Sequence, residues 1–273
     1  MNTSFADIEK KENRKDLIIS ICVFLSGFSC FAQLYYFQPL LPDLAKDFIL
    51  SASESSFAIS FSTLGMVFGL FTTMFVADRI PRKKMIGTGL LSSSIFSVAA
   101  SFSPTFLPLI LLSAAKGFLL SGATSVSMAY IAEEVSSRNK GKIMGLYIAG
   151  NALGGMAGRV ISSWIGALYT WRIASVSIGL ICALFAILFL LFSPRSTNFM
   201  PRKESFHTLI IANLQLITSK ALIPFYLTGG LILGVFVSLY NYLGFYLTKA
   251  PFNFPEHYIH YIYLMYIFGI FGS

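Results

Sequence analysis

The chain has 273 residues, of which 55% are hydrophobic and 12% are charged, and its formal net charge is +8 at pH 7. Soluble domains carry about 25% charged residues, so this composition excludes an ordinary soluble globular protein. The positive charge is scattered over short segments and forms no compact patch, so we do not expect the chain to bind nucleic acid.

Seven stretches along the chain contain almost no charge and are each about 18 to 26 residues long. Because a helix rises about 1.5 Å per residue, each stretch is long enough to cross a hydrocarbon layer of about 30 Å. Lipid gives the backbone no hydrogen-bond partner, so these spans must be helical. The predicted spans are 17–38, 56–77, 85–102, 107–131, 143–165, 173–192 and 222–247, with an eighth beginning near Tyr258.

Basic residues collect on alternate connections between the spans. With the N-terminus placed in the cytoplasm, 15 of the 20 Lys and Arg residues lie inside and 4 outside, Arg159 being counted among the outer four and Lys116 within a span. This bias predicts a multi-pass protein whose N-terminus is cytoplasmic. The first apolar stretch is too long for a cleaved signal peptide, so we expect it to remain as a span.

Titratable residues limit the chemistry that the spans could perform. All 12 acidic residues lie in tails, loops or span ends, and Cys22, Cys30 and Cys182 lack metal-ligand spacing. No cofactor is therefore predicted, and the absence of clustered His, Asp and Glu argues against an enzyme. Proton coupling usually needs an ionisable group in mid-membrane. Three alternatives follow. The proton-coupling group lies in a missing second half, an edge acid such as Asp43 serves as that group, or transport is not coupled to protons. His257 and His260 are further candidates.

A weak internal repeat suggests two halves. Residues 34–37 read LYYF, residues 239–242 read LYNY, and both strings are followed by Pro and Phe residues. With the long basic connection after the sixth span, this favours two six-helix halves in the same orientation. The expected organisation is a cytoplasmic tail at 1–16, a six-helix bundle at 17–192, a cytoplasmic linker at 193–221 and an incomplete second bundle at 222–273.

The connection between the second and third spans resembles the signature of the major facilitator superfamily, G-x-x-x-D-R-x-G-R-[KR]. Residues 74–83 read MFVADRIPRK, so both glycines are replaced. In that family the acid pairs with basic neighbours and helix ends and latches the cytoplasmic side shut. The resemblance assigns this role to Asp78, Arg79, Arg82 and Lys83. The alternative is that Asp78 is a solvated loop acid whose ion pairs contribute about 0–1 kcal/mol.

The fourth span resembles the family pattern R-x-x-x-G-x-x-x-x-G. Residues 113–122 read SAAKGFLLSG, with Ser113 at the Arg position and Lys116 one helical turn further. A charge at this depth is costly, so we expect Lys116 to face a wet cavity or a partner. The predicted substrate cavity is lined by Gln33, Tyr36, Lys116 and Asn151, a mixture that suits semi-polar organic solutes. The alternatives are that Lys116 snorkels outward and that Tyr36 belongs to an interfacial belt.

The fifth span carries a row of glycines at a spacing of four, formed by Gly150, Gly154 and Gly158, with Gly155 beside it. Small residues on one face allow two helices in lipid to approach closely, so we expect a packing interface. The row also resembles the glycine-rich motif in the fifth helix of drug/proton antiporters, although the proline usual there is missing. A specific role in antiport remains a second reading.

Residues 33–42, 145–156 and 240–243 narrow the resemblance to YnfM-type permeases, a group assigned to efflux of small organic compounds. It implies an all-α integral membrane protein of the bacterial inner membrane, with the six-helix N-terminal half and the first one to two helices of the second. The expected function is secondary active efflux by alternating access. We expect the chain to end early and to be inactive unless a second chain supplies the missing helices. The alternative is a half-size partner or scaffold that does not transport.

Overall fold

The computed structural model describes residues 5–201, 206–255 and 263, and every regular element in these ranges is a helix. The expected all-α membrane fold is thereby confirmed. The predicted eighth span, with His257 and His260, lies outside the described residues except for Tyr263, and so do Arg202 and Lys203 of the linker. The elements are α1 (Phe5–Tyr35), η1 (Gln38–Leu40), α2 (Leu41–Asp47), α3 (Ala52–Ser55), α4 (Phe57–Val76), η2 (Ala77–Arg79), α5 (Arg82–Ser101), α6 (Phe106–Glu134), α7 (Lys140–Leu168), α8 (Trp171–Phe192), α9 (Phe206–Ile217) and α10 (Ile223–Thr248).

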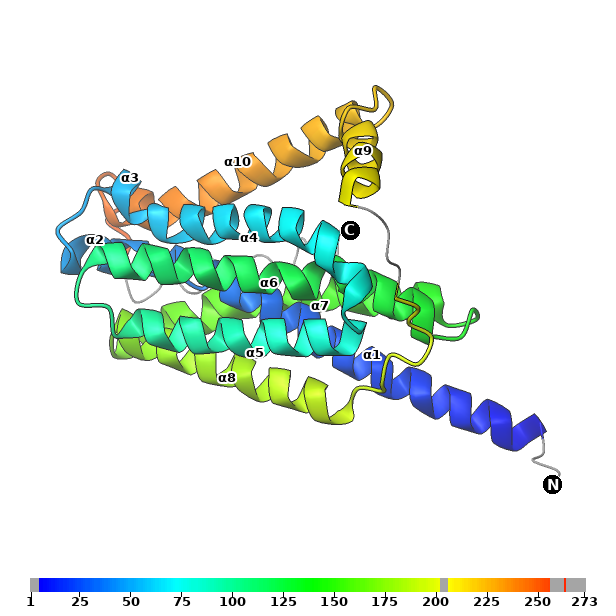
Figure 1. Ribbon diagram of the computed structural model, residues 1–273. Helices are drawn as coiled ribbons and strands as arrows, with labels where there is room; N and C mark the ends of the chain where they lie inside the picture. Colours follow the sequence, from blue (N-terminus) through cyan, green and yellow to red (C-terminus); the bar gives the residue numbers. More distant parts are fainter. Residues whose placement is uncertain (1–4, 202–205, 256–262, 264–273) are drawn as a thin grey trace.

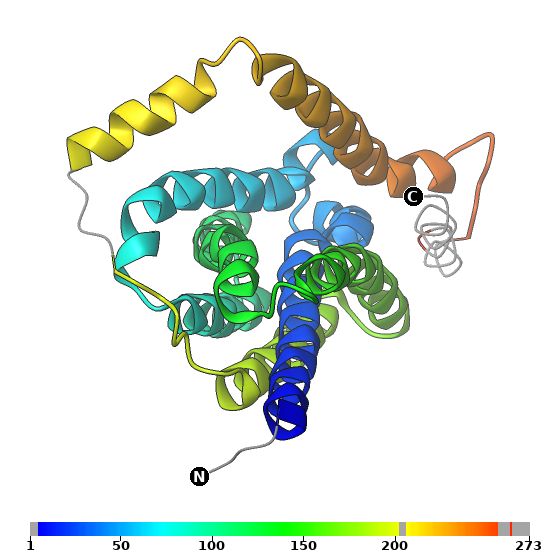
Figure 2. The same cartoon turned by 90° about the vertical axis from the view of Figure 1, so that its right-hand side faces the viewer.

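Six long helices, α1 and α4 to α8, run side by side in one bundle (Figure 1). A view along the bundle shows α9 and α10 lying outside it (Figure 2). We call the end that carries Lys15, Arg82 and Glu134 the charged end, and the end that carries Asp47 and Trp171 the far end. The charged end is on the right in Figure 1.

Within the described part of the chain, five helices are long and apolar enough to cross a membrane: α1, α4, α6, α8 and α10. Helices α5 and α7, which the sequence also predicts as spans, have 20 and 29 residues. Serine, glycine and basic residues lower their hydropathy, but both are packed between the other helices of the bundle: α5 contacts α6 and α8, and α7 contacts α1 and α8. Both helices are thus flanked by other helices of the bundle.

Two of the predicted connections contain helices. Helix α1 begins at Phe5 and therefore includes most of the predicted tail, and the predicted linker contains α9.

Between α1 and α4 the chain folds into three short helices. The last of these starts with a capping box, in which Glu54 N donates to Ser51 Oγ at 3.2 Å and Ser51 N donates to Glu54 Oε2 at 2.8 Å. Such reciprocal bonds satisfy backbone donors that a helix start leaves free.

The glycine row of α7 packs on the backbone of α1. A Cβ atom on Gly150 would lie 2.5 Å from the carbonyl oxygen of Phe24, and one on Gly158 would lie 2.7 Å from the Cα of Ala32. Gly154 meets Phe28 in the same way. Three contacts spaced by four residues on both helices keep the two backbones in register, as small residues do in membrane helix pairs.

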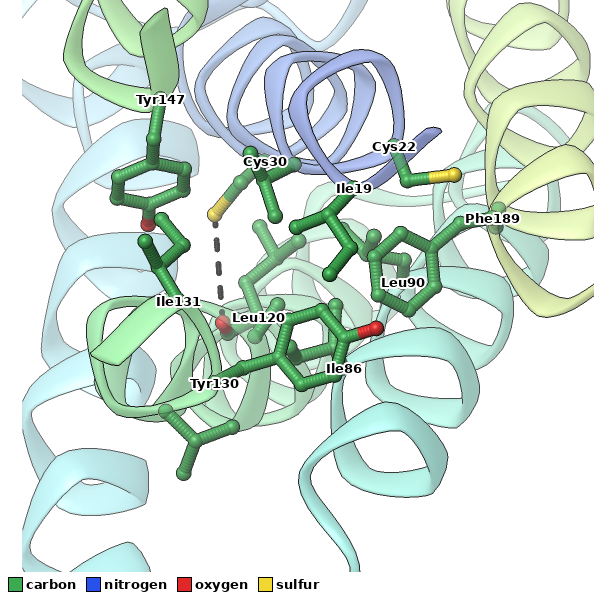
Figure 3. Packing of buried hydrophobic residues seen from close by; sticks show 14 of the residues in the cluster. Ile19, Cys22, Cys30, Ile86, Leu90, Leu120, Tyr130, Ile131, Tyr147 and Phe189 are labelled. Carbon is green, nitrogen blue, oxygen red and sulfur yellow. Dashed lines mark hydrogen bonds between the residues drawn. The ribbon is translucent and has the colours of Figure 1, made fainter. Parts of the chain in front are cut away.

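Two clusters of buried apolar side chains fill the bundle, one toward each end. The cluster toward the charged end joins five helices, α1 and α5 to α8, and includes Ile19, Leu90 and Tyr147 (Figure 3). The Cys30 thiol lies in it and donates to the carbonyl oxygen of Leu120. The three cysteines are buried and free, in accord with the expectation that they fill apolar space.

Helix α10 touches the bundle at its C-terminal end, where it meets η1 and α2. Gly244 lies there against Pro42, with a Cβ placed on it 3.2 Å from the proline ring. Toward its N-terminus the side chains of α10 are exposed, including Phe225 (74%) and Ile232 (67%). The helix is therefore joined to the bundle at the far end and separates from it toward the charged end (Figure 1).

Candidate functional site

Three of the predicted cavity residues form one buried cluster. Lys116 is 1% exposed, and its Nζ lies 4.5 Å from the ring centre of Tyr36 and 5.0 Å from that of Phe37. Gln33 and Tyr36 are fully buried, and Ser97 of α5 donates a 3.2 Å hydrogen bond to Gln33 Oε1. Stacking over two rings stabilises an ammonium group that is removed from water.

This cluster is rich in donors that lack acceptors. Among the described residues, Lys116 Nζ, Tyr36 Oη and Gln33 Nε2 have no hydrogen-bond partner. The Nζ atom of Lys116 does not reach the surface of the bundle, as it would in a snorkelling lysine. Tyr36 is enclosed as well. The cluster lies inside the bundle, among α1, α5 and α6.

Asn151 lies apart from this cluster. It belongs to α7 and faces Gly27 of α1, where a Cβ added to Gly27 would meet the Asn151 side chain and lie 2.9 Å from the carbonyl oxygen of Tyr147. The glycine of α1 leaves room for this amide in the tight α1–α7 contact. Asn151 is thus part of the helix interface.

A second polar site, which we call the arginine junction, lies where α1, α7 and α10 meet. Arg159 of α7 is 1% exposed, and its guanidinium carbon lies 4.4 Å from the ring centre of Tyr35, 5.2 Å from that of Tyr240 and 5.6 Å from that of Phe236. Tyr35 ends α1, whereas the other two rings belong to α10. The guanidinium thus contacts aromatic rings of the bundle and aromatic rings of α10.

Hydrogen bonds extend the arginine junction. Arg159 Nε donates to Gln38 Oε1, and Arg159 Nη1 donates to the carbonyl oxygen of Gly155 at 2.6 Å. The amide nitrogen of Gln38 then donates to Asn241 Oδ1 of α10 at 2.8 Å. Gln38 therefore connects the buried cation of the bundle to the seventh long helix.

The signature residues lie at the charged end. Arg82 Nη2 contacts Asp78 Oδ1 at 2.9 Å and Glu133 Oε1 of α6 at 3.0 Å. Lys83 Nζ donates to the carbonyl oxygen of Ser193, and Arg79 is exposed. Asp78 does pair with a basic neighbour, and the described pairs tie η2 and α5 to α6 within the bundle.

A second ionic cluster at the charged end surrounds Glu134, whose side chain is fully buried. Its carboxylate accepts hydrogen bonds from Lys15 at 2.9 Å, from Thr197 at 2.8 Å and from the backbone N–H of Asn198 at 2.7 Å. Nearby, Asp16 accepts a 2.8 Å bond from the side chain of Asn139. The start of α1 and the chain that follows α8 are thereby fastened to α6 and to its connection with α7.

The sequence patterns do not single out Arg159, Gln38, Asn241, Glu133 or Glu134 as site residues. The sequence places Arg159 near the outer end of its span, whereas α7 continues to Leu168 and the guanidinium is buried. Its distance from that helix end, about 13 Å at 1.5 Å per residue, is the signal that could have found it. The two repeated tyrosine strings indicate Gln38 and Asn241, because Gln38 directly follows the string at 34–37 and Asn241 lies within the string at 239–242.

Comparison with known proteins places this geometry in a family. The family model described as Major Facilitator Superfamily matches residues 20–273. An uncharacterized transporter of Buchnera aphidicola (subsp. Schizaphis graminum) is 35% identical over 245 residues, which are 90% of this chain and 59% of that protein. The inner membrane transport protein YnfM of Escherichia coli (strain K12) is 35% identical over 86% of this chain and 56% of its own length.

The folds agree as well. A crystal structure of a bacterial homologue of the human lysosomal transporter Spinster, in an inward-facing and unoccupied conformation, superposes with a TM-score of 0.72 at 13% identity and covers 90% of this chain and 58% of that one. The chain thus spans less than two thirds of the length of these relatives. With most of its residues matched by the family model, it belongs to the Major Facilitator Superfamily of multi-pass membrane transporters.

Proposed function

We propose that this chain is part of a secondary active transporter that moves small organic solutes out of a bacterial cell across the inner membrane. The arginine junction carries the proposal. It places a permanent charge, two amides and three aromatic rings where the bundle meets α10. Ionisable groups buried at membrane depth mark solute or ion pathways, because lipid makes them too costly to keep without a function.

The asymmetric position of α10 supports alternating access. Contacts at the far end, through Gln38, Pro42, Asn241 and Gly244, hold α10 to the bundle, whereas toward the charged end its side chains are exposed. In transporters built from two repeats, one half rocks against the other around a site near mid-membrane. The described arrangement suits a state closed at the far end and open at the charged end.

We place the charged end in the cytoplasm. It carries Arg82, Lys83 and Arg138, and basic residues concentrate on the cytoplasmic side of membrane proteins. The far end then faces the periplasm, and the state described above is open to the inside.

Alternating access needs a second bundle, whereas the described residues contain one six-helix bundle and α10. We therefore propose that transport requires further helices, from additional sequence or from a second chain. The bilayer is the obligatory partner. A chain that only assembles with another transporter, without contributing to a solute path, is the competing possibility that the following experiment addresses.

The test is solute flux in everted membrane vesicles. The chain is expressed alone and together with the part of E. coli YnfM that lies beyond the matched region, and uptake of radiolabelled anionic, neutral and cationic aromatic solutes is followed with and without a pH gradient. Saturable uptake above empty-vector vesicles in the co-expressed sample supports transport. Uptake equal to that of empty-vector vesicles for every solute class, with both polypeptides present in the membrane, would contradict it.

A further inference from the structure

We propose that a crevice among α4, α5 and α6 binds one molecule of an anionic phospholipid, with an acyl chain in the crevice and the phosphate at Arg79 and Lys84. The site goes beyond the proposed transport of organic solutes and does not depend on it. It is drawn from the walls of the crevice, from its position on the bundle and from the two basic side chains at its mouth.

The crevice exists because α4 and α5 both pack on α6 and, within the described chain, hardly on each other (Figure 1). A Cβ atom on Gly69 would lie 2.5 Å from the carbonyl oxygen of Phe118, and one on Gly89 would lie 2.8 Å from that of Leu119. The two glycines thus let α4 and α5 approach α6 closely, and a space of about 210 Å³ stays open between them. It follows residues 69–76 of α4 and is about 10 Å long at 1.5 Å per residue.

The walls of the crevice suit hydrocarbon. Phe118 of α6 lines it and is 41% exposed, and Val76, Met85 and Leu119 line it as well. Most hydroxyl groups in the walls donate to a carbonyl oxygen of their own helix, namely those of Thr72, Thr73, Thr88 and Ser121. Because these donors are already paired, an acyl chain can fill the crevice without leaving them unsatisfied.

The crevice lies on the side of α4 that is turned away from α10. The α4 residues that line it include Gly69, Thr72 and Val76. A second space, shared with Tyr226 of α10, is lined by Val67, Leu70 and Met74 of α4. The two sets are offset by two residues, which at 3.6 residues per turn is about 200°, so they occupy opposite faces of the helix. Helices that pack beside α10 would cover the second space, and we expect the crevice to face the bilayer.

Two basic side chains stand where the crevice reaches the charged end. Lys84 lies one helical turn before Thr88 on α5, and Arg79 lies three residues after Val76, beyond the end of α4. Both side chains are exposed. A lipid whose acyl chain follows the crevice therefore brings its phosphate to the level of these two residues.

The surrounding charges leave this mouth positive. Arg82 contacts both Asp78 and Glu133, and Lys83 lies beside it in the chain, so two basic residues balance two acids. The two exposed basic side chains at the mouth form no ion pair with any described residue. Basic pockets at the ends of membrane helices attract anionic headgroups. An apolar crevice that ends in two surplus positive charges matches an anionic phospholipid.

Photo-crosslinking of the full chain in lipid nanodiscs tests the inference. The probes are phosphatidylglycerol and phosphatidylcholine with the same diazirine-bearing acyl chain, each added in traces to phosphatidylcholine bilayers, and adducts are located by peptide mass spectrometry. We expect phosphatidylglycerol to label Phe118 and Leu119 about 10-fold more than phosphatidylcholine does.

The double variant Arg79→Gln with Lys84→Gln should lower the yield with phosphatidylglycerol to that with phosphatidylcholine. Both side chains lie outside the ion pairs of the bundle, so this variant should fold like the wild type in detergent. Lys142→Gln, which removes an exposed lysine of α7 at the charged end, is the control and should leave the yield unchanged.

A further substitution fills the crevice without changing its charge. A Cβ atom on Gly122, which lines the crevice, would make only ordinary contacts, the nearest at 3.6 Å from the side chain of Met85. Gly122→Leu should therefore fit and abolish labelling of Phe118 and Leu119 by both probes. Gly145→Leu is the matched control, because a Cβ atom there has no neighbour within 4 Å.

Competition in the wild type keeps the test decisive if Gly122→Leu does not fold. An excess of unlabelled phosphatidylglycerol should remove the preferential labelling, whereas glycerol phosphate, which carries the charge without acyl chains, should not. Equal labelling by the two probes, loss of labelling with glycerol phosphate, or an unchanged yield in the double variant would overturn the inference. Absence of adducts in the crevice with both probes would overturn it too, because protein and not lipid would then cover the crevice.

Discussion

Gln38 and Asn241 are 203 residues apart in the chain, and the amide nitrogen of Gln38 donates a 2.8 Å hydrogen bond to Asn241 Oδ1. This bond joins the six-helix bundle to α10 at the far end. Replacing Asn241 with Leu removes the acceptor and leaves the contact between Arg159 and Gln38 in place. Side-chain hydrogen bonds between membrane helices contribute about 0.6 to 2 kcal/mol, so α10 should be held less firmly.

Spin labels at Leu168 and Tyr246, which are exposed on α7 and α10, measure that loss. The distance distribution should be broader in Asn241→Leu than in the parent. Asn213→Leu is the matched control, because Asn213 bonds to a carbonyl of its own helix at Leu209. An unchanged distribution in Asn241→Leu would show that the bond does not hold α10.

The glycine row of α7 offers two substitutions with opposite expected effects. A Cβ on Gly154 would overlap the backbone of Phe28, whereas one on Gly145 of the same helix would meet no atom within 4 Å. Gly154→Ala should therefore destabilise the bundle by about 1–3 kcal/mol through overpacking. Gly145→Ala should stabilise it by up to about 1 kcal/mol through helix propensity. Unfolding in mixed detergent micelles measures both, and equal effects of the two variants would refute the close α1–α7 contact.

Glu134 is the buried carboxylate that fastens the segment after α8. Glu134→Gln removes the buried charge, and the partly buried bonds from Thr197 and Asn198 lose a strong acceptor. We therefore expect a loss of about 3 kcal/mol in stability, at the lower end for a broken buried ion pair. Glu12→Gln, an exposed acid near the start of α1, is the control and should change stability by less than about 0.5 kcal/mol. Protease cleavage after residue 193 should also become faster in Glu134→Gln alone.

Arg82 connects two acids of the charged end, so its loss should cost more than the loss of either partner. Arg82→Met leaves Asp78 and Glu133 close together without a cation, whereas Asp78→Asn leaves the bond to Glu133 intact. We expect Arg82→Met to lower the temperature at which half of the protein aggregates in detergent, and to lower it clearly more than Asp78→Asn does. Lys84→Met, at an exposed position two residues on, controls for the loss of positive charge. Equal shifts for all three variants would contradict this network.

The sequence predicts the helices of this fold well because lipid restricts spanning segments to long apolar helices. All seven complete predicted spans overlap helices of the structure, including α5 and α7, whose small polar residues make them the least apolar. Helical spacing also identifies the row of Gly150, Gly154 and Gly158 as one face. These are local properties, which residue types and spacing determine directly.

The site depends on contacts that spacing does not encode. Gln33, Tyr36 and Lys116 come together because the end of α1 meets the middle of α6, whereas Asn151 faces α1 at a different level. The pairing of Gln38 with Asn241 needs the packing of α10 against η1. A hydrophobic pattern shows which face of a helix is apolar, but it does not tell which helix covers that face.

Labelling of two engineered cysteines tests most directly whether the bundle spans the membrane with its charged end in the cytoplasm. The native cysteines are buried, whereas Ser137 at the charged end and Tyr169 at the far end are exposed. In intact cells with a permeabilised outer membrane, an impermeant maleimide should label Tyr169→Cys at once and Ser137→Cys only after lysis. Labelling of Ser137→Cys in intact cells, or of both positions alike, would contradict the proposed arrangement.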